Sequence, residues 1–136
     1  MTRINIVPPK ELSDQHLVAE YREIFMVGPA LQRSLKSSRF NVQRIPKTYT
    51  LGQGHVMFFY DKGCYLQKRY CSLRDQMISR GMKPNPSRVF DINKFPQPFR
   101  RDWVPSANEL QIARERINSK IAQKKHWYRF TKPKDA

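Results

Sequence analysis

The sequence predicts an all-α protein, because three stretches carry apolar side chains at helical spacing and two long irregular segments join them. Domains commonly hold about 100 to 150 residues, and dividing a chain of 136 residues would leave cores too small to be stable. We therefore expect a single compact domain over residues 1–136, built from three main helices with long ordered loops. A short amino-terminal arm is expected to lie against the first helix.

The first helix is expected over residues 13–36, with Ser13 as a suitable N-cap. Its apolar stripe consists of Leu17, Val18, Tyr21, Ile24 and Phe25. Gly28 and Pro29 interrupt this run. Since proline removes an amide donor and clashes with the preceding turn, we expect a kink or a short break there before the helix resumes.

The second helix is expected over residues 64–80. Its apolar side chains recur at intervals of four, three and four residues, at Leu66, Tyr70, Leu73 and Met77. Gly81 suits the C′ position that ends such a helix. The segment before it is irregular, and its apolar run at residues 56–60 fits either a strand or a buried connector, because periodicity alone does not separate the two.

Residues 82–105 contain five prolines, a density that excludes long regular elements. The same segment carries many large apolar side chains, which a solvated linker would not need, so we expect an ordered loop that packs on the helices. The third helix is expected to run from Ser106 to about Gln123, because Ser106 and Glu109 form the S-x-x-E capping-box pattern. Its inward face consists of Leu110, Ala113, Ile117 and Ile121.

The chain carries a formal charge of +15, with 26 lysines and arginines against 11 aspartates and glutamates. Such an excess repels itself unless a polyanion neutralises it, so nucleic acid is the first partner to consider. Charge alone also fits a ribosome-associated or architectural protein, or a protein that binds membrane surfaces. The membrane alternative is weakened, since no segment approaches the roughly 20 apolar residues of a spanning helix and the amino terminus lacks a signal-peptide core. We expect a protein that is not secreted and stays where DNA is accessible, in the cytoplasm or nucleoid of a bacterium or in an infected host cell.

Cys64 and Cys71 are the only cysteines. If both lie on one helix, their separation along its axis is about 10.5 Å, which is too long for a disulfide. Reduced cysteines indicate an intracellular setting. No further cysteine or histidine has the spacing of a structural zinc site, so we expect no metal.

The first helix has a polar face on which His16, Ala19, Glu20 and Glu23 lie opposite the apolar stripe. Most such faces are simply solvated. The four- and three-residue spacing of His16, Glu20 and Glu23 also suggests metal ligands, although no further ligand follows at a matching distance. On a surface that meets DNA, however, a carboxylate is repelled by phosphates and weakens binding. Glu23 is therefore a candidate acid/base group.

Thr2 is the candidate nucleophile. Aminopeptidases generally remove a methionine that precedes a small residue, which would leave Thr2 with the free α-amine. An α-amino group has a pKa of about 7.7 to 8 against about 10.4 for lysine, so near neutral pH its unprotonated fraction is roughly 10²-fold larger. Such an amine suits Schiff-base chemistry. The other interpretation is that Thr2 is an ordinary second residue of the kind many proteins tolerate.

Several blocks of the sequence, in order, resemble the pyrimidine-dimer DNA glycosylase family, the phage endonuclease V type. They are MTRIN at residues 1–5, DQHL at 14–17, AEYRE at 19–23, LGQGHV at 51–56, FFYDK at 58–62, KIAQ at 120–123 and WY at 127–128. The likeness covers most of the chain. It implies a glycosylase with linked abasic-site lyase activity on cyclobutane pyrimidine dimers in duplex DNA.

In the chemistry that this resemblance implies, the amine of Thr2 attacks the deoxyribose of the damaged nucleotide and forms an imine after the base departs. Glu23 then assists removal of a 2′ proton, so that the 3′ phosphate leaves by β-elimination. No metal or nucleotide cofactor is implied. The expected partner is double-stranded DNA that contains ultraviolet lesions or abasic sites, and the enzyme is expected to be a monomer.

The resemblance also marks eight positions as DNA contacts. They are Arg3, Gln15, His16, Arg22, Arg116, Lys120, Trp127 and Tyr128. Arg116 and Lys120 lie four residues apart on the third helix and are therefore neighbours that can grip phosphates. The aromatic faces of the tail can stack on bases, with core packing as the alternative for Trp127.

Three departures from the family pattern concern DNA affinity. Met26 stands where arginine occurs in the best-known member, Gly28 and Pro29 shift the helix-breaking proline, and the tail has one aromatic residue fewer. We expect altered affinity or salt dependence and an unchanged reaction. The alternatives are a non-catalytic basic module that binds nucleic acid and an abasic-site lyase that does not excise dimers.

Overall fold

The chain folds into α-helices joined by 3₁₀ turns and extended segments, and the computed structural model describes residues 3–134. The α-helices of this part are α1 (Asp14–Glu23), α2 (Val27–Leu35), α3 (His55–Phe58), α4 (Gly63–Ser79) and α5 (Ala107–Gln123). Its 3₁₀ turns are η1 (Pro9–Glu11), η2 (Ile24–Met26), η3 (Val42–Arg44), η4 (Ile92–Lys94) and η5 (Gln97–Phe99). Residues 3–134 contain no strand, so the all-α prediction is confirmed.

The first predicted helix is divided in two, and the division precedes Gly28 and Pro29. Ser13 caps α1 as predicted, since its hydroxyl accepts the amide of His16 at 3.1 Å. The turn η2 then separates α1 from α2. Because the break comes early, Pro29 lies in the first turn of α2, where amides have no intrahelical acceptor and a missing donor is no loss.

The apolar run at residues 56–60 is a buried connector that contains most of α3, so the strand alternative is wrong. Phe58, Phe59 and Tyr60 are all buried. The rings of Phe58 and Phe59 lie edge to face, with centroids 5.0 Å apart, and Trp103 packs edge to face against both. This aromatic cluster joins the centre of the chain to the loop that precedes α5.

The helices α4 and α5 end and begin as predicted. Gly81 follows α4 with φ 86°, the left-handed conformation that the C′ position requires. At the start of α5, the hydroxyl of Ser106 accepts the amide of Glu109 at 3.1 Å, and the carboxylate of Glu109 accepts the amide of Ser106 at 3.0 Å. Ala113 and Ile117 are the buried apolar residues of α5, and Leu110 and Ile121 are only partly buried.

The proline-rich segment 82–105 is ordered and packs on the helices, as predicted. Phe90, Phe95 and Phe99 are buried. Gly63, at the start of α4, makes room for one of them, because a Cβ at Gly63 would lie 3.0 Å from the ring of Phe95. The loop thus closes over the first turn of α4.

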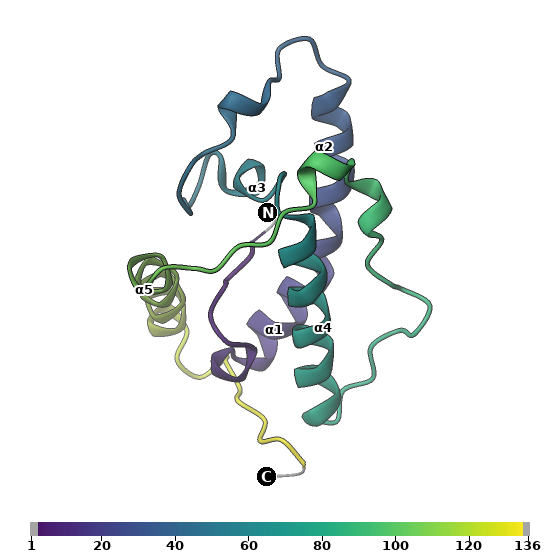
Figure 1. Cartoon of the computed structure of the whole chain (residues 1–136). Coiled ribbons are helices and arrows are strands. Elements are labelled where there is room, and N and C mark those ends of the chain that lie inside the picture. The colour runs from purple at the N-terminus through teal and green to yellow at the C-terminus, as the bar shows by residue number, and fades with distance from the viewer. Residues whose placement is uncertain (1–2, 135–136) are drawn as a thin grey trace.

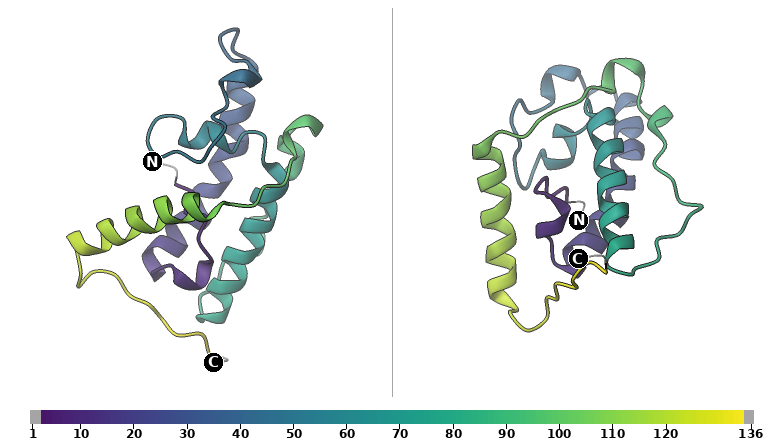
Figure 2. Two further views of the ribbon diagram at one scale, coloured as in Figure 1. Left: turned by 60° about the vertical axis from the view of Figure 1, so that its left-hand side comes forward. Right: turned by 60° about the horizontal axis from the view of Figure 1, so that its bottom comes forward.

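The helices lie in two groups with the amino-terminal arm between them. In Figures 1 and 2, α1 runs beside α4 and α2 continues from α1, whereas α5 lies on the opposite side of the arm. The tail after α5 returns to the carboxyl end of α4, where the amide of Lys134 donates to the carbonyl of Ser79 at 2.7 Å. The prediction that the arm lies against the first helix is confirmed, since the amide of Asn5 donates to Glu20 of α1 at 3.1 Å.

A buried ion pair joins α1 to α4. Arg69 donates through Nε and Nη2 to the carboxylate of Glu20 at 2.6 and 2.9 Å, and the two side chains are 5% and 0% exposed. Nη1 of Arg69 also donates to the carbonyl of Val7 in the arm. The alternative that the polar face of the first helix is simply solvated is wrong at Glu20, because the opposite charge of Arg69 stabilises its carboxylate inside the core.

Replacing Arg69 by methionine should lower the free energy of unfolding by about 3 to 5 kcal/mol, because it would leave a buried carboxylate without its partner. Lys68→Met is the matched control on the same helix: it breaks an exposed ion pair with Asp102, 66% and 47% exposed, and should change stability little. Urea unfolding followed by circular dichroism measures both variants. Equal stability of Arg69→Met and the unaltered protein would show that the pair does not hold α1 on α4.

Candidate active site

The amino-terminal arm is fixed by hydrogen bonds to three other parts of the chain. Ile4 is fully buried; its amide donates to Nε2 of His55 at 2.9 Å, and its carbonyl accepts the hydroxyl of Tyr49 at 2.9 Å. The next amide, of Asn5, donates to Glu20. The arm therefore approaches α1 along a path that the core determines.

The arm turns sharply at Ile6, whose φ is 54°. The amide of Val7 donates across this turn to the carbonyl of Asn5 at 2.6 Å. A positive φ is rare for a β-branched residue and costs about 1 to 3 kcal/mol, so it persists only where the surroundings enforce it. Here the carbonyl of Val7 is bound by Arg69 and the side chains of Ile6 and Val7 are buried, which holds the turn in place.

A pocket of about 150 Å³ lies where the arm, α1 and α5 meet. It is lined by Arg3, Asn5, His16, Ala19, Glu20, Glu23 and Arg116. The amide of Arg3 donates a hydrogen bond to the carboxylate of Glu23. The polar face of α1 is therefore not simply solvated, since the arm and α5 cover part of it.

The pocket changes the ionisation of its side chains. Burial raises the pKa of Glu23 above its usual value, and the neighbouring carboxylate of Glu20 adds to this, while the amide of Arg3 and the guanidinium of Arg116 oppose it. Burial and the charge of Arg116 lower the pKa of His16, so its imidazole is neutral near pH 7. Burial and the charge of Arg3 lower the pKa of Arg116. The pocket thus offers a carboxyl group that ionises less readily than a free glutamate.

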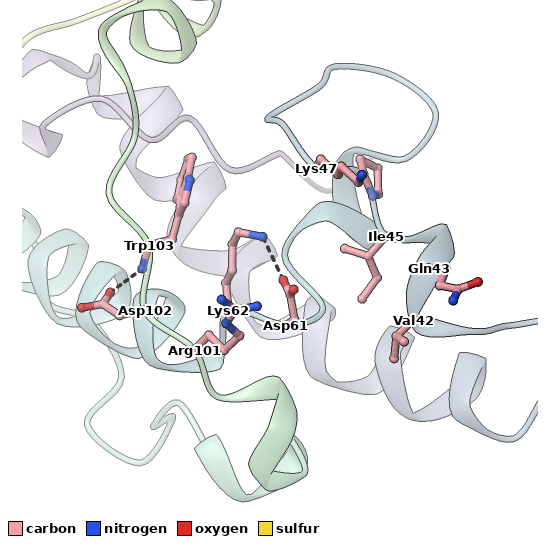
Figure 3. Close-up of a pocket in the computed structure, with 10 residues that line it drawn as sticks. Val42, Gln43, Ile45, Lys47, Asp61, Lys62, Arg101, Asp102 and Trp103 are labelled. Atoms are coloured by element: carbon pink, nitrogen blue, oxygen red, sulfur yellow. Dashed lines mark hydrogen bonds and ion pairs between the residues drawn. The ribbon is translucent and has the colours of Figure 1, made fainter.

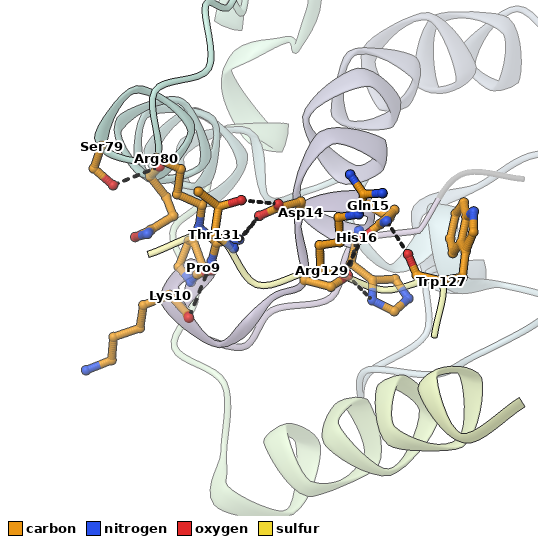
Figure 4. Close-up of polar contacts among 12 residues, drawn as sticks. Pro9, Lys10, Asp14, Gln15, His16, Ser79, Arg80, Trp127, Arg129 and Thr131 are labelled. Carbon is orange, nitrogen blue, oxygen red and sulfur yellow. Dashed lines mark hydrogen bonds and ion pairs between the residues drawn. The ribbon is translucent and has the colours of Figure 1, made fainter. Parts of the chain in front are cut away.

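The carboxyl-terminal tail crosses the beginning of α1 (Figure 4). Gln15 holds the backbone of the tail at two points: its side chain donates to the carbonyl of Trp127 at 2.6 Å and accepts the amide of Arg129 at 3.0 Å. Asp14 accepts both the amide and the hydroxyl of Thr131. The start of α1 therefore sets where the aromatic residues of the tail lie.

The tail carries two adjacent aromatic side chains, one of which lies beside the pocket. Tyr128 stacks on His16, with ring centroids 4.8 Å apart and an interplanar angle of 16°. Trp127 is 55% exposed, so the alternative that it packs in the core is wrong. Its indole lies edge to face with Tyr128, with ring centroids 4.9 Å apart, and Nζ of Lys124 lies 5.8 Å from the centroid of the indole.

The structure brings together part of the predicted site. The predicted residues at the pocket are Arg3, His16, Glu23 and Arg116, with Tyr128 stacked on His16. Arg22 and Lys120 are exposed and do not line the pocket, and Gln15 binds the tail. The predicted nucleophile, Thr2, lies outside the described residues.

Sequence reasoning missed the residues that hold the arm, namely Tyr49, His55 and Arg69, and it missed Asn5 of the arm itself, which lines the pocket. A signal existed for Arg69, which lies three residues after Leu66 and four before Leu73, within the apolar stripe of α4. A charged residue at such a position requires a buried partner of opposite charge. Tyr49 and His55 carry no comparable signal, because they belong to or border an irregular segment.

A larger cavity, of about 390 Å³, lies between the segment before α3 and the segment before α5 (Figure 3). Its acidic groups are already paired, Asp61 with Lys62 at 2.8 Å and Asp102 with Lys68 at 2.5 Å. None of the site residues predicted from the sequence is among its lining residues. The smaller pocket, which gathers four of those residues, is therefore the candidate active site.

Residues 3–134 hold no group of three histidine, cysteine, aspartate or glutamate side chains that could bind a metal ion. The metal alternative for the polar face of α1 is wrong, because the carboxylate of Glu20 is bound to Arg69. In the same described part, Cys64 and Cys71 both lie on α4 and are not joined to each other. No helix there has the length and apolar character needed to cross a membrane.

An all-α fold, a charge of +15 and a pocket that sets a carboxyl group beside arginines are the features expected of an enzyme that binds nucleic acid. The model of the pyrimidine dimer DNA glycosylase family matches residues 1–89. The chain belongs to this family, so it is a DNA repair glycosylase and DNA is its substrate. The matched part contains the arm, α1 to α4 and Glu23, and it ends before α5.

Glu23→Gln should raise the free energy of unfolding near neutral pH. A raised pKa means that the ionised carboxyl of Glu23 destabilises the folded state. Glu23 therefore contributes to the free energy of unfolding below its usual pKa of 4.5, and this contribution is lost as the pH rises through its higher pKa in the folded protein. The advantage of Glu23→Gln should therefore shrink as the pH falls toward 4.5. Urea unfolding at a series of pH values measures this difference.

Glu11→Gln is the matched control and should show the opposite sign. The hydrogen bond from Arg114 lowers the pKa of Glu11, so the stability linked to Glu11 is present above the usual 4.5 and is lost as the pH falls through the lower folded-state value. Glu11→Gln should therefore be less stable than the unaltered protein near neutral pH. A loss of stability in both variants there would contradict the assignment for Glu23.

Proposed function

We propose that the protein excises cyclobutane pyrimidine dimers from ultraviolet-damaged duplex DNA and then cleaves the abasic site, with the α-amine of Thr2 as nucleophile and Glu23 as acid/base group. The observation that carries this proposal is the hydrogen bond from the amide of Arg3 to the carboxylate of Glu23. Three covalent bonds separate that amide nitrogen from the α-nitrogen of residue 2, which limits their separation to about 4 Å. This constraint supports pairing a free amine at Thr2 with Glu23.

In the proposed reaction the unprotonated amine attacks C1′ of one nucleotide of the dimer, and the glycosidic bond breaks. The bonding electrons go to the base, which leaves the sugar but stays joined to the neighbouring base through the cyclobutane ring. Loss of a proton from the nitrogen and opening of the sugar ring give an imine. Glu23 then accepts a proton from C2′, and the C3′–O bond breaks so that the 3′ phosphate leaves. Burial raises the pKa of Glu23, and a raised pKa makes its carboxylate a stronger base for this step.

The DNA surface that we propose surrounds the pocket. Arg3 and Arg116 bind phosphates beside the reacting sugar, and the exposed Arg22 and Lys120 extend this contact. Trp127 and Tyr128 stack on bases. Gln15 and His16 contribute by holding these two aromatic residues in place.

We infer further that residues 1–136 act as one domain and as a monomer. The support is that α5, which lies beyond the part matched by the family model, supplies Arg116 to the same pocket as Arg3 and Glu23. The reaction needs an amine, a carboxyl group and cations, all of which this chain supplies without a cofactor. We propose that the protein acts in the cellular compartment where damaged duplex DNA is accessible.

Incubation of the protein with borohydride and a dimer-containing duplex should give a covalent protein–DNA adduct, because borohydride reduces the imine to a stable amine. Acetylation of the terminal amine should abolish the adduct. The control is a mass measurement of the intact protein, which should show that Met1 is absent before acetylation. Binding without an adduct would instead favour the non-catalytic module, and an adduct with abasic but not with irradiated DNA would favour the lyase alone.

Arg116→Met should reduce the slope of log affinity against log salt by about 1, because one phosphate contact is lost. Arg114→Met is the matched control, since Arg114 lies on the same helix but is bound to Glu11 at 2.9 Å. Its removal should leave the salt slope unchanged. Fluorescence anisotropy with an undamaged duplex measures both, and equal slopes for the two variants would remove Arg116 from the DNA surface.

A further inference from the structure

Both backbone polar groups of Ile4 are bound by side chains from the irregular segment around α3. The amide donates to Nε2 of His55, and the carbonyl accepts the hydroxyl of Tyr49, each at 2.9 Å. The exposed fractions are 0% for Ile4, 1% for His55 and 4% for Tyr49. Water therefore does not compete for these groups, and each hydrogen bond restrains the arm more strongly than an exposed one would.

Each of the two side chains is itself held. Nδ1 of His55 lies 2.8 Å from the carbonyl of Thr50, which makes Nδ1 the donor and leaves Nε2 as the acceptor for Ile4. Burial lowers the pKa of His55 to about 4, so this neutral form persists near neutral pH. Burial raises the pKa of Tyr49 to about 12, so its hydroxyl keeps its proton. The amide of Tyr49 donates at 2.7 Å to Glu109, the N3 residue of the capping box of α5.

We propose that His55 and Tyr49 are positioning residues, which hold the arm at Ile4 so that the α-nitrogen two residues upstream meets Glu23. This inference rests on the proposed role of the terminal amine. Neither residue lines the pocket that contains Glu23, so their effect is exerted through the arm. Through its own amide, Tyr49 also couples the arm to α5.

Tyr49→Phe tests this most cleanly, because it removes the hydroxyl and keeps both the ring and the backbone amide. The variant should slow imine formation about 10-fold, since a misplacement of about 1 Å can cost up to about 10²-fold in rate. The rate is measured by borohydride trapping in a single turnover on a duplex with an abasic site. Its affinity for that duplex, measured by fluorescence anisotropy, should stay unchanged, because no DNA-binding side chain is altered.

Tyr60→Phe is the matched control. The hydroxyl of Tyr60 binds Ser34 at 2.9 Å and the carbonyl of Ala30 at 3.2 Å, next to α2 and away from the arm. Like Tyr49→Phe, this substitution removes a hydrogen-bonded hydroxyl from a buried tyrosine. Tyr60→Phe should therefore lose a similar amount of stability and form the imine at the rate of the unaltered protein.

His55 is tested by two substitutions. His55→Leu removes the acceptor for the amide of Ile4 and should slow imine formation by up to about 10²-fold. His55→Gln carries an acceptor and a donor on one amide group, so it should restore part of that rate. If His55→Leu fails to fold, the comparison of Tyr49→Phe with Tyr60→Phe decides the question.

Equal rates of imine formation for Tyr49→Phe and Tyr60→Phe would overturn the inference. A fall in affinity that matches the fall in rate would also overturn it, because it would indicate a general loss of structure. Failure of the proposed function has a different signature: the unaltered protein would give no adduct, or an adduct on a lysine, and that result overturns both proposals. Trapping at the terminal amine with an unimpaired Tyr49→Phe variant overturns only the role of the two positioning residues.

Discussion

The ion pair of Glu20 and Arg69 lies inside the core, and the candidate site is built against it. Neither charge would be stable there alone, because transfer of an isolated ion from water costs far more than the folded state can offset. Their pairing sets α1 against α4, and the groups that remain bind the arm at the amide of Asn5 and the carbonyl of Val7. One contact thus orders two helices and the arm together.

An arm ordered in this way has a consequence for catalysis. A terminal amine is normally attached to mobile chain, and fixing it beside an acid/base group only when DNA arrives would add an entropic barrier to the reaction. Here the residues from Ile4 onward are already bound to α1, α3 and α4 before any substrate is present. Only three rotatable bonds then separate the fixed amide of Ile4 from the proposed nucleophile, namely the two backbone bonds of Arg3 and the Cα–C bond of residue 2.

The site must bind a polyanion and also contain a carboxyl group, and these two requirements conflict electrostatically. A charge of +15 attracts DNA, whereas a carboxylate at the surface repels phosphates. Of the two carboxyl groups at the pocket, Glu20 is neutralised by Arg69, and Glu23 has a raised pKa and two neighbouring arginines. The protein can therefore keep an acid/base group at its DNA surface with less repulsion than a fully exposed glutamate would cause.

The sequence predicted those features that depend on neighbouring residues. The capping box of Ser106 and Glu109, the N-cap Ser13 and the left-handed Gly81 are each specified within a few residues, and all three are present. The break between α1 and α2 comes before its predicted position at Gly28 and Pro29. A new helix that begins two residues before Pro29 places the proline in its first turn, where the missing amide donor costs nothing.

Features that depend on distant residues could not be predicted in the same way. Glu20 lies near the edge of the apolar stripe of α1, and only the position of Arg69, 49 residues later, decides that its side chain is buried. The binding of Ile4 by His55 likewise joins residues 51 positions apart. The resemblance to a glycosylase family singled out Glu23, which lines a pocket in the structure, but the geometry of the arm required the structure.

Hydrogen exchange at the amides of Ile4 and Asn5 tests most directly whether the arm is ordered before DNA binds. If their hydrogen bonds to His55 and Glu20 persist in solution, both amides should exchange only when the core opens, with protection close to that of buried amides in α4. Exchange at the rate of an unstructured chain end, in a protein whose α4 remains protected, would contradict the account.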